Sequence, residues 1–83
     1  MDKMMLFRTS DLYFSAFLSA LDIVLETTEQ EVGKDSRKVI FVFKVNEADL
    51  TRFKSLYFGG SGTVKAKKFV DAIRGLKSLC HVQ

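Results

Sequence analysis

The residues that could support chemistry are few and scattered. The sequence has one cysteine and one histidine, the neighbours Cys80 and His81. A thiol nucleophile needs a base held against it and a third group that orients the base. Adjacent helical residues project about 100° apart, and no third group is apparent. Metal sites take three or four protein ligands, mostly Cys and His. The sequence therefore predicts no catalytic residue, no metal site, no cofactor and no small-molecule substrate.

A glycine-rich segment at residues 59–65 (Gly-Gly-Ser-Gly-Thr-Val-Lys) invites a phosphate-binding interpretation, because backbone amides before a helix can bind an anion. The phosphate loop of nucleotide-binding proteins follows a strand and ends in Gly-Lys-Ser/Thr. Here the segment follows a predicted helix and the ending is absent. The pattern favours a loop between two helices.

Charge is distributed unevenly, although the net charge is only +3. The first 31 residues carry six acidic and two basic side chains, and the rest carry eleven basic and four acidic ones. A basic segment attracts polyanions, and aromatic side chains beside it can stack on bases. An acidic half and a basic half can also face each other in a dimer. The candidate contacts with nucleic acid or a partner are Tyr57, Phe58, Lys65, Lys67, Lys68 and Arg74.

These candidates also have a purely structural interpretation. Asp71 lies between Lys67 and Arg74, which is typical of a solvated helix face. Tyr57 and Phe58 cannot both face inward on one helix, so we expect one of them to be partly exposed and to mark a contact surface.

The elements that would position these residues are readable from apolar spacing and caps. Thr9 or Ser10 can cap a first helix that is apolar on nearly every side. Turn residues at 33–36 separate two β-rich segments, and Asn46 can cap the next helix. We expect helices at about 10–21, 47–58 and 65–80, and a hairpin of strands at about 23–32 and 37–45.

The second strand of this hairpin is apolar on both faces. Val39, Phe41, Phe43 and Val45 point one way. The candidate dimer strand presents the other side, formed by Ile40 and Val42 between Lys38 and Lys44. A two-stranded sheet is marginal alone and an exposed apolar edge invites pairing with another chain. We therefore expect a homodimer that joins two hairpins into a longer sheet.

Length and composition place the chain as one α+β domain spanning residues 1–83, in the order α-β-β-α-α, with the hairpin packed on helices. A domain of this size buries only about 60% of its unfolded surface, which also favours self-association. An unpaired cysteine and the absence of proline fit a reducing compartment, so we expect a cytoplasmic protein. No apolar stretch approaches the ~20 residues that span a bilayer, and we expect no signal peptide and no membrane contact.

Three segments resemble a known family: Phe7-Arg-Thr-Ser-Asp-Leu-Tyr-Phe-Ser-Ala-Phe-Leu18, Val39-Ile-Phe-Val-Phe43, and the run from Leu56-Tyr-Phe-Gly-Gly60 into the closing helix at residues 64–77. Together they look like a small bacterial family catalogued as a domain of unknown function. The sequence departs from the family at Ser15, where Ala is usual, and at Gly59, where Asn is usual. The resemblance implies a self-contained domain from a phage, plasmid or other mobile context, and it implies no reaction.

Two functions remain open at this point. One is a small non-catalytic interaction or accessory module that self-associates through its hairpin. The alternative is a nucleic-acid-binding accessory protein that uses the basic C-terminal half. An enzyme is not expected.

Overall fold

Within residues 3–33 and 37–80, which the computed structural model describes, strands and helices follow the order β-α-β-β-α-α. The elements are β1 (Met4–Thr9), α1 (Leu12–Ala20), β2 (Val24–Val32), β3 (Arg37–Asn46), α2 (Glu47–Phe58) and α3 (Ala66–Cys80). The α+β class is confirmed, and the helices and the hairpin lie within two residues of the expected ranges. Of the expected turn at 33–36, residues 34–36 lie outside the described residues, as does His81.

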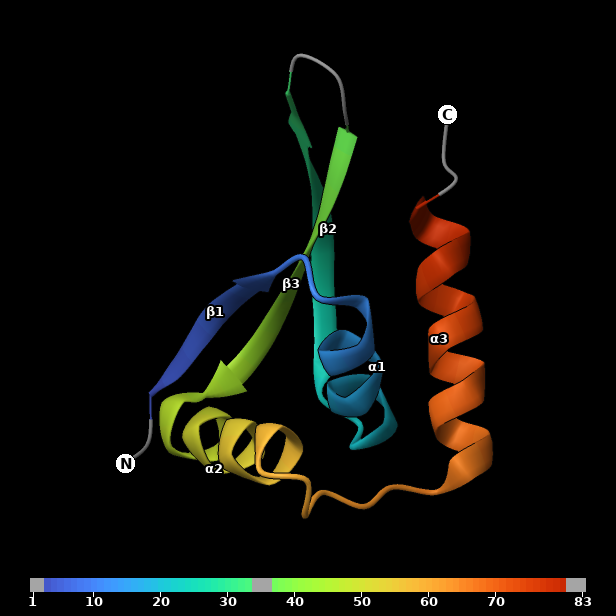
Figure 1. Cartoon of the computed structure of the whole chain (residues 1–83). Helices are drawn as coiled ribbons and strands as arrows, with labels where there is room; N and C mark the ends of the chain where they lie inside the picture. Colours follow the sequence, from blue (N-terminus) through green and yellow to red (C-terminus); the bar gives the residue numbers. More distant parts are fainter. Residues whose placement is uncertain (1–2, 34–36, 81–83) are drawn as a thin grey trace.

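The three strands form one antiparallel sheet in the order β1-β3-β2. The central strand is β3, which pairs with β1 from Met4 opposite Asn46 to Thr9 opposite Phe41. Its other side pairs with β2, whose register shifts between Leu25 and Thr27. The apolar centre of β3 therefore has a paired strand on either side (Figure 1).

The expected order α-β-β-α-α is wrong at its start because it omits β1. The segment Met-Met-Leu-Phe-Arg-Thr lacks the alternation of apolar and polar residues that identifies a strand. Its partner residues in β3 lie 32 to 42 positions further along the chain. Tertiary pairing of this range leaves no local signal in the sequence.

Side-chain and backbone caps define both ends of α1. The N-cap is Asp11, one residue later than expected, and its carboxylate accepts a hydrogen bond from the Phe14 amide at 3.0 Å. At the other end the Ile23 amide donates to the Leu18 carbonyl at 3.1 Å, and Asp22 takes the left-handed conformation with φ of 64°. This is a Schellman cap in which aspartate occupies the position that glycine usually takes.

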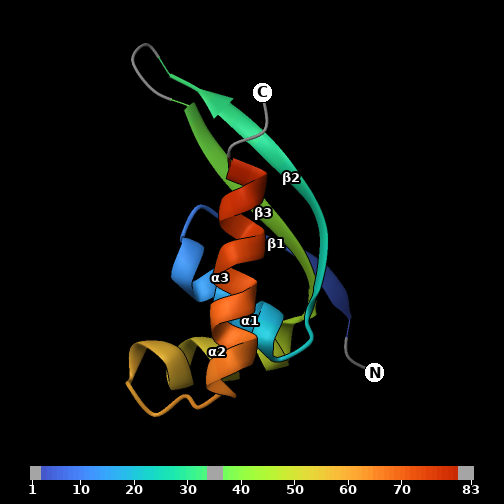
Figure 2. The ribbon, with the colours of Figure 1, turned by 90° about the vertical axis from the view of Figure 1, so that its right-hand side faces the viewer.

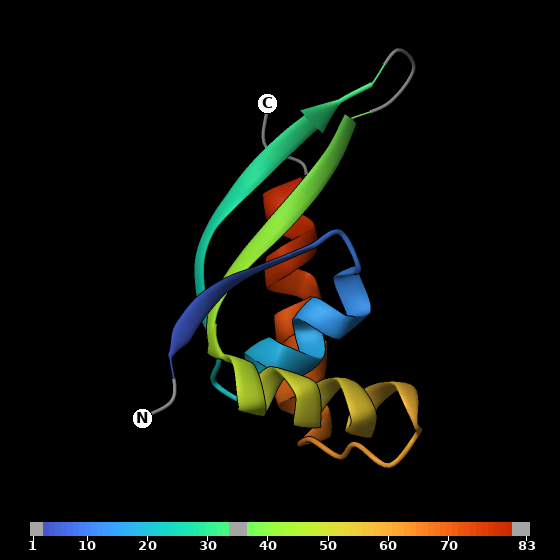
Figure 3. The ribbon, with the colours of Figure 1, turned by 90° about the vertical axis from the view of Figure 1, so that its left-hand side faces the viewer.

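All three helices lie on the same side of the sheet (Figures 2 and 3). The helix α1 packs against the sheet, and α3 packs mainly on α1 (Figure 1). The core forms between these helices and one face of the sheet; its buried members are Phe14, Ala16, Phe17, Leu18, Phe41, Phe43, Val45, Leu50, Phe53 and Leu76. The opposite face of the sheet carries no helix of the described part of the chain.

Candidate interaction surfaces

Aromatic side chains from β1, α1 and α2 meet at one corner of the molecule. The Phe14 ring lies 5.2 Å from the Tyr57 ring and 5.3 Å from the Phe58 ring, centroid to centroid. Tyr57 and Phe58 contact each other edge-on at 4.9 Å. Tyr57 is half-buried, whereas 65% of Phe58 is exposed. The prediction that one of the two adjacent aromatics faces solvent is confirmed.

The one titratable side chain of this aromatic pair is Tyr57, whose phenol lies on an otherwise apolar surface. Burial raises the pKa of Tyr57 above its ordinary value of 10.0, and the nearby Asp11 carboxylate and Tyr13 hydroxyl raise it further. The Tyr57 hydroxyl therefore stays protonated at neutral pH. It can donate a hydrogen bond to a partner but cannot act as a base there.

Two of the four candidate lysines and arginines are engaged in ion pairs within the chain. Lys68 contacts both carboxylate oxygens of Asp22, at 3.1 and 3.0 Å. Lys67 contacts Asp71 one turn further along α3, at 3.1 Å. Both pairs are solvent-exposed. Each removes part of the positive charge that a polyanion would meet.

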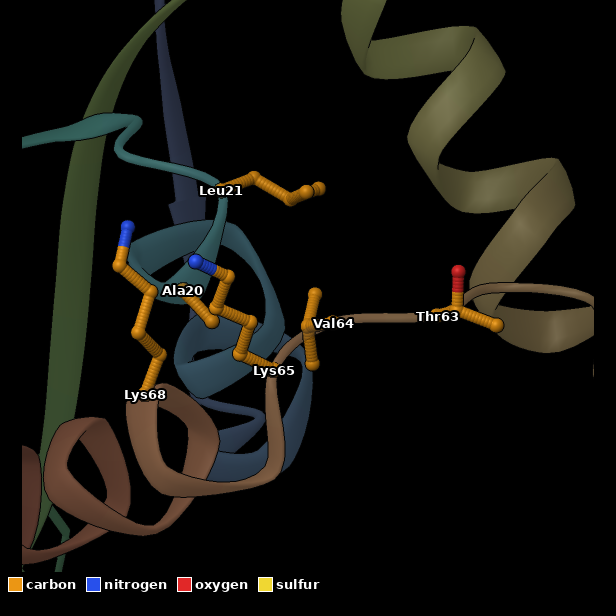
Figure 4. A pocket seen from close by; sticks show the side chains of 6 residues that line it. All are labelled: Ala20, Leu21, Thr63, Val64, Lys65 and Lys68. Carbon is orange, nitrogen blue, oxygen red and sulfur yellow. The ribbon is translucent and has the colours of Figure 1, made fainter.

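Lys65 has a structural position as well. It lines a pocket of about 420 Å³ between the start of α3 and the end of α1, together with Ala20, Leu21, Thr63, Val64 and Lys68. Both lysine side chains extend toward the C-terminal end of α1 (Figure 4). That end of a helix carries partial negative charge, and α1 has no basic residue in its own last turn. Lys65 and Lys68, at the start of α3, thus complement the C-terminal end of α1.

The structure does not bring the six candidate contacts together. The aromatic pair Tyr57 and Phe58 contacts Phe14, in the first turn of α1. Lys65 and Lys68 lie at the opposite end of the same helix (Figure 4). The aromatic pair and the two lysines therefore lie near different ends of α1.

The first four residues of the glycine-rich segment cap α2. All four amides of residues 59–62 donate to carbonyls in the last turn of α2. Ser61 and Gly62 both donate to Leu56, at 2.9 and 2.8 Å, and Gly60 has a φ of 79°. These amides are therefore committed within the fold, and the phosphate-loop interpretation is set aside in favour of the interhelical loop.

Close packing against α1 explains the last glycine of this segment. A Cβ added at Gly62 would lie 2.7 Å from the Phe17 ring. Beside it is a second pocket of about 420 Å³, largely apolar and open to solvent, lined by Phe17, Tyr57, Gly60, Gly62, Thr63, Val64, Ala66 and Phe69.

The uncovered face of the sheet, called here the outer face, carries the four candidate dimer residues. Strand alternation places Lys38, Ile40, Val42 and Lys44 on this face, because Phe41, Phe43 and Val45 point into the core. The register adds residues of the neighbouring strands, which are Met4, Leu6, Arg8, Val24, Thr27, Glu29 and Glu31.

An ion pair crosses the centre of the outer face. The Arg8 Nε atom on β1 lies 3.2 Å from the Glu29 Oε1 atom on β2, so the pair passes over β3, which separates those strands. Beneath it, Val42 pairs with Arg8 and Thr27 and is only 1% exposed. Val42 is thus buried by its neighbours in the sheet.

The end of the outer face that adjoins α2 carries three exposed apolar side chains around Lys44. Met4, Leu6 and Val24 are 54%, 48% and 58% exposed. Leu6 and Val24 lie at the same height on either side of Lys44, since both pair with it. Sequence reasoning missed the β1 members of this group because it missed the strand.

Both sides of β3 are filled within the chain, so this strand has no edge to offer a second copy. Among the described strands, the free edge of the expected hairpin is that of β2, and β1 supplies the second edge of the sheet. The idea that the hairpin extends its sheet through the Lys38–Val45 strand is therefore corrected. The four candidate residues can take part in a dimer only through their face.

Other kinds of site were sought in the described part of the chain. In residues 3–33 and 37–80, no group of three or more His, Cys, Asp and Glu side chains could hold a metal ion. No helix there is long and apolar enough to span a membrane. Cys80 is exposed at the end of α3.

Together the fold and these surfaces define a small α+β domain, and in its described part the helices cover one face of the antiparallel sheet. The chain belongs to the family described as a domain of unknown function (DUF5659), which matches residues 4–82. Membership of a family of unknown function, expected from the resemblance, is confirmed. No curated protein and no solved structure matches the chain.

Proposed function

We propose that this domain is a non-catalytic interaction module that self-associates through its sheet. The observation that carries the proposal is the apolar, helix-free end of the outer face, where Met4, Leu6 and Val24 are each about half exposed. Exposed apolar side chains grouped on one face are a mark of interaction sites, and here they lie on either side of the exposed Lys44. A small domain also gains buried area by associating.

The charges of the outer face favour a copy of the same chain as the partner. Basic side chains lie on β3, at Lys38 and Lys44, and acidic ones lie on β2, at Glu29 and Glu31. A surface that carries both signs does not repel a second copy of the same chain as a surface of one sign would. A partner of one charge sign would meet repulsion from one of the two rows.

The test is the mass of the chain in solution across a concentration series. Sedimentation equilibrium from about 1 µM to 1 mM spans the dissociation constants of weak to moderate dimers. We expect the mass-average to rise from one chain to two, and the rise to persist at high salt because the exposed side chains are apolar. A mass of one chain throughout would contradict the proposal.

Nucleic-acid binding remains the second candidate, favoured by the eleven basic residues after residue 31. Two exposed residues of α3, Arg74 and Lys77, carry no ion pair in the described part of the chain. Titration of single- and double-stranded DNA and RNA at two salt concentrations tests it, since phosphate contacts make affinity fall steeply with salt. If binding is seen, the double variant Arg74→Glu, Lys77→Glu should abolish it. Absence of binding at low salt removes this candidate.

A further inference from the structure

Within the described residues the sheet has two free edges, and their side chains differ in kind. The β2 edge runs from Val24 to Val32 and carries Glu26, Glu29 and Glu31 without a basic residue. It also contains the irregularity between Leu25 and Thr27. Acidic side chains and bulges are the devices by which natural proteins keep an edge strand from pairing. Two copies of β2 side by side would bring their glutamates together, which is unfavourable.

The β1 edge has neither protection. Its sequence, Met-Met-Leu-Phe-Arg-Thr, has no acidic residue and no proline, and its one charge, Arg8, is paired with Glu29. Met4, Met5 and Leu6 are exposed. In the view that looks onto this side of the molecule, no helix passes in front of β1 (Figure 3). A strand added here would pair with the outward backbone groups of β1.

We propose that two copies of the chain pair through β1, antiparallel, about a two-fold axis perpendicular to the sheet. The proposal rests on the self-association put forward above and names the contact. Pairing of this kind doubles the three-stranded sheet into one continuous sheet, in the order β2-β3-β1-β1-β3-β2. The helices of both copies then lie on the same side.

Symmetry restricts the register of this pairing. Opposed residues in an antiparallel pair point to the same face of the sheet. In β1 the even-numbered residues point to the outer face and the odd-numbered ones to the inner face, so an even-numbered residue must lie opposite an even-numbered one. The register centred on the strand sets Leu6 opposite Leu6 of the second copy and Met4 opposite Arg8. On the inner face Met5 then lies opposite Phe7. No like charges oppose each other, which makes an identical strand a suitable partner for this edge.

The experiment compares two lysine substitutions that are matched in place. Leu6 and Val24 both pair with Lys44, lie on the outer face and are about half exposed, but they belong to opposite edges. Sedimentation equilibrium is run on wild type, Leu6→Lys and Val24→Lys, with circular dichroism and thermal unfolding to verify that each variant folds.

We expect Leu6→Lys to raise the dimer dissociation constant by about tenfold or more, because it sets two lysines opposite each other. Val24→Lys should leave the constant within about threefold of wild type. Equal weakening by both variants would show that the sheets pack face to face, and weakening by Val24→Lys alone would show pairing through β2. Either result overturns the β1 contact while self-association stands. A monomeric wild type overturns both.

A cross-linking experiment avoids dependence on the lysine variants. In a Cys80→Ser background, Leu6→Cys places thiols directly opposite across the proposed axis, and Val24→Cys is the matched control. We expect Leu6→Cys to form a disulfide-linked dimer under mild oxidation and Val24→Cys to stay largely monomeric. Equal cross-linking of the two, or cross-linking of the control alone, contradicts the proposal.

Discussion

The two faces of β3 are both apolar at their centres, yet they are buried in different ways. On the inner face, Phe41 and Phe43 are enclosed by the aromatic and aliphatic side chains of three helices. On the outer face, Val42 is equally inaccessible at 1% exposed, but only its neighbours in the sheet and an ion pair lie over it. Burial on one face comes from packing between layers, and on the other from packing within a layer. The first makes a core, and the second leaves a surface that a partner can cover.

The largest expected loss of stability comes from truncating a side chain on the inner face, and it should exceed the loss on the outer face. Phe43→Ala should lower the free energy of unfolding by about 4 kcal/mol, because it opens a cavity among side chains that cannot collapse. Val42→Ala should cost about 2 kcal/mol, since it removes two methyl groups from a site without a second layer above it. Chemical denaturation monitored by circular dichroism measures both. Equal losses would break the distinction between the faces.

A methyl group added at Gly62 tests how tightly the helix-covered side of the sheet is packed. Gly62→Ala should cost about 2 kcal/mol, because the new methyl group would lie 2.7 Å from the Phe17 ring and 3.3 Å from the Leu56 carbonyl carbon. Gly75→Ala is a suitable control, since a Cβ there meets nothing within 4 Å. It should stabilise α3 slightly. Thermal unfolding ranks the two, and a Gly62→Ala variant as stable as wild type would show that this interface is loosely packed.

The ion pair over Val42 should contribute little by itself. Arg8 and Glu29 are each about half exposed, at 53% and 47%, and exposed pairs are worth about 0.5 kcal/mol. A double-mutant cycle with Arg8→Ala and Glu29→Ala measures the coupling directly, and 0.5 M salt should reduce it. A coupling above about 2 kcal/mol would mean that the pair is desolvated, as it would be if a partner covered the outer face.

The smallest effect concerns pH on the helix side. Since burial raises the pKa of Tyr57 in the folded state, the folded protein holds the phenol neutral while the unfolded chain ionises near pH 10. The stability contribution of Tyr57 is therefore complete below about pH 10 and is lost as the pH rises further. Wild type should lose stability more steeply than Tyr57→Phe above that pH. Parallel curves would contradict the raised pKa.

Local patterns in the sequence predict most of the fold. The glycines and Ser61 after Phe58 end α2 where they were expected to, and the alternation from Lys38 to Val45 assigns each residue of β3 to its face. These features depend on neighbours within a few positions, so a single sequence displays them.

What depends on distant pairing could not be predicted. Residues 4–9 become a strand only because β3 accepts them more than thirty positions later. Without β1, the free edge was assigned to the hairpin, and the exposed Met4 and Leu6 were not recognised as part of a surface. The link between Lys68 and Asp22 likewise joins residues 46 positions apart, which turned an expected basic patch into a contact within the fold.

The most direct test of the proposed contact is amide hydrogen exchange at low and high protein concentration. Pairing through β1 predicts that alternate amides of residues 4–9, those directed away from β3, exchange more slowly as the chain is concentrated, whereas the outward amides of β2 do not change. Protection that grows along β2, or that does not depend on concentration at either edge, would contradict the account.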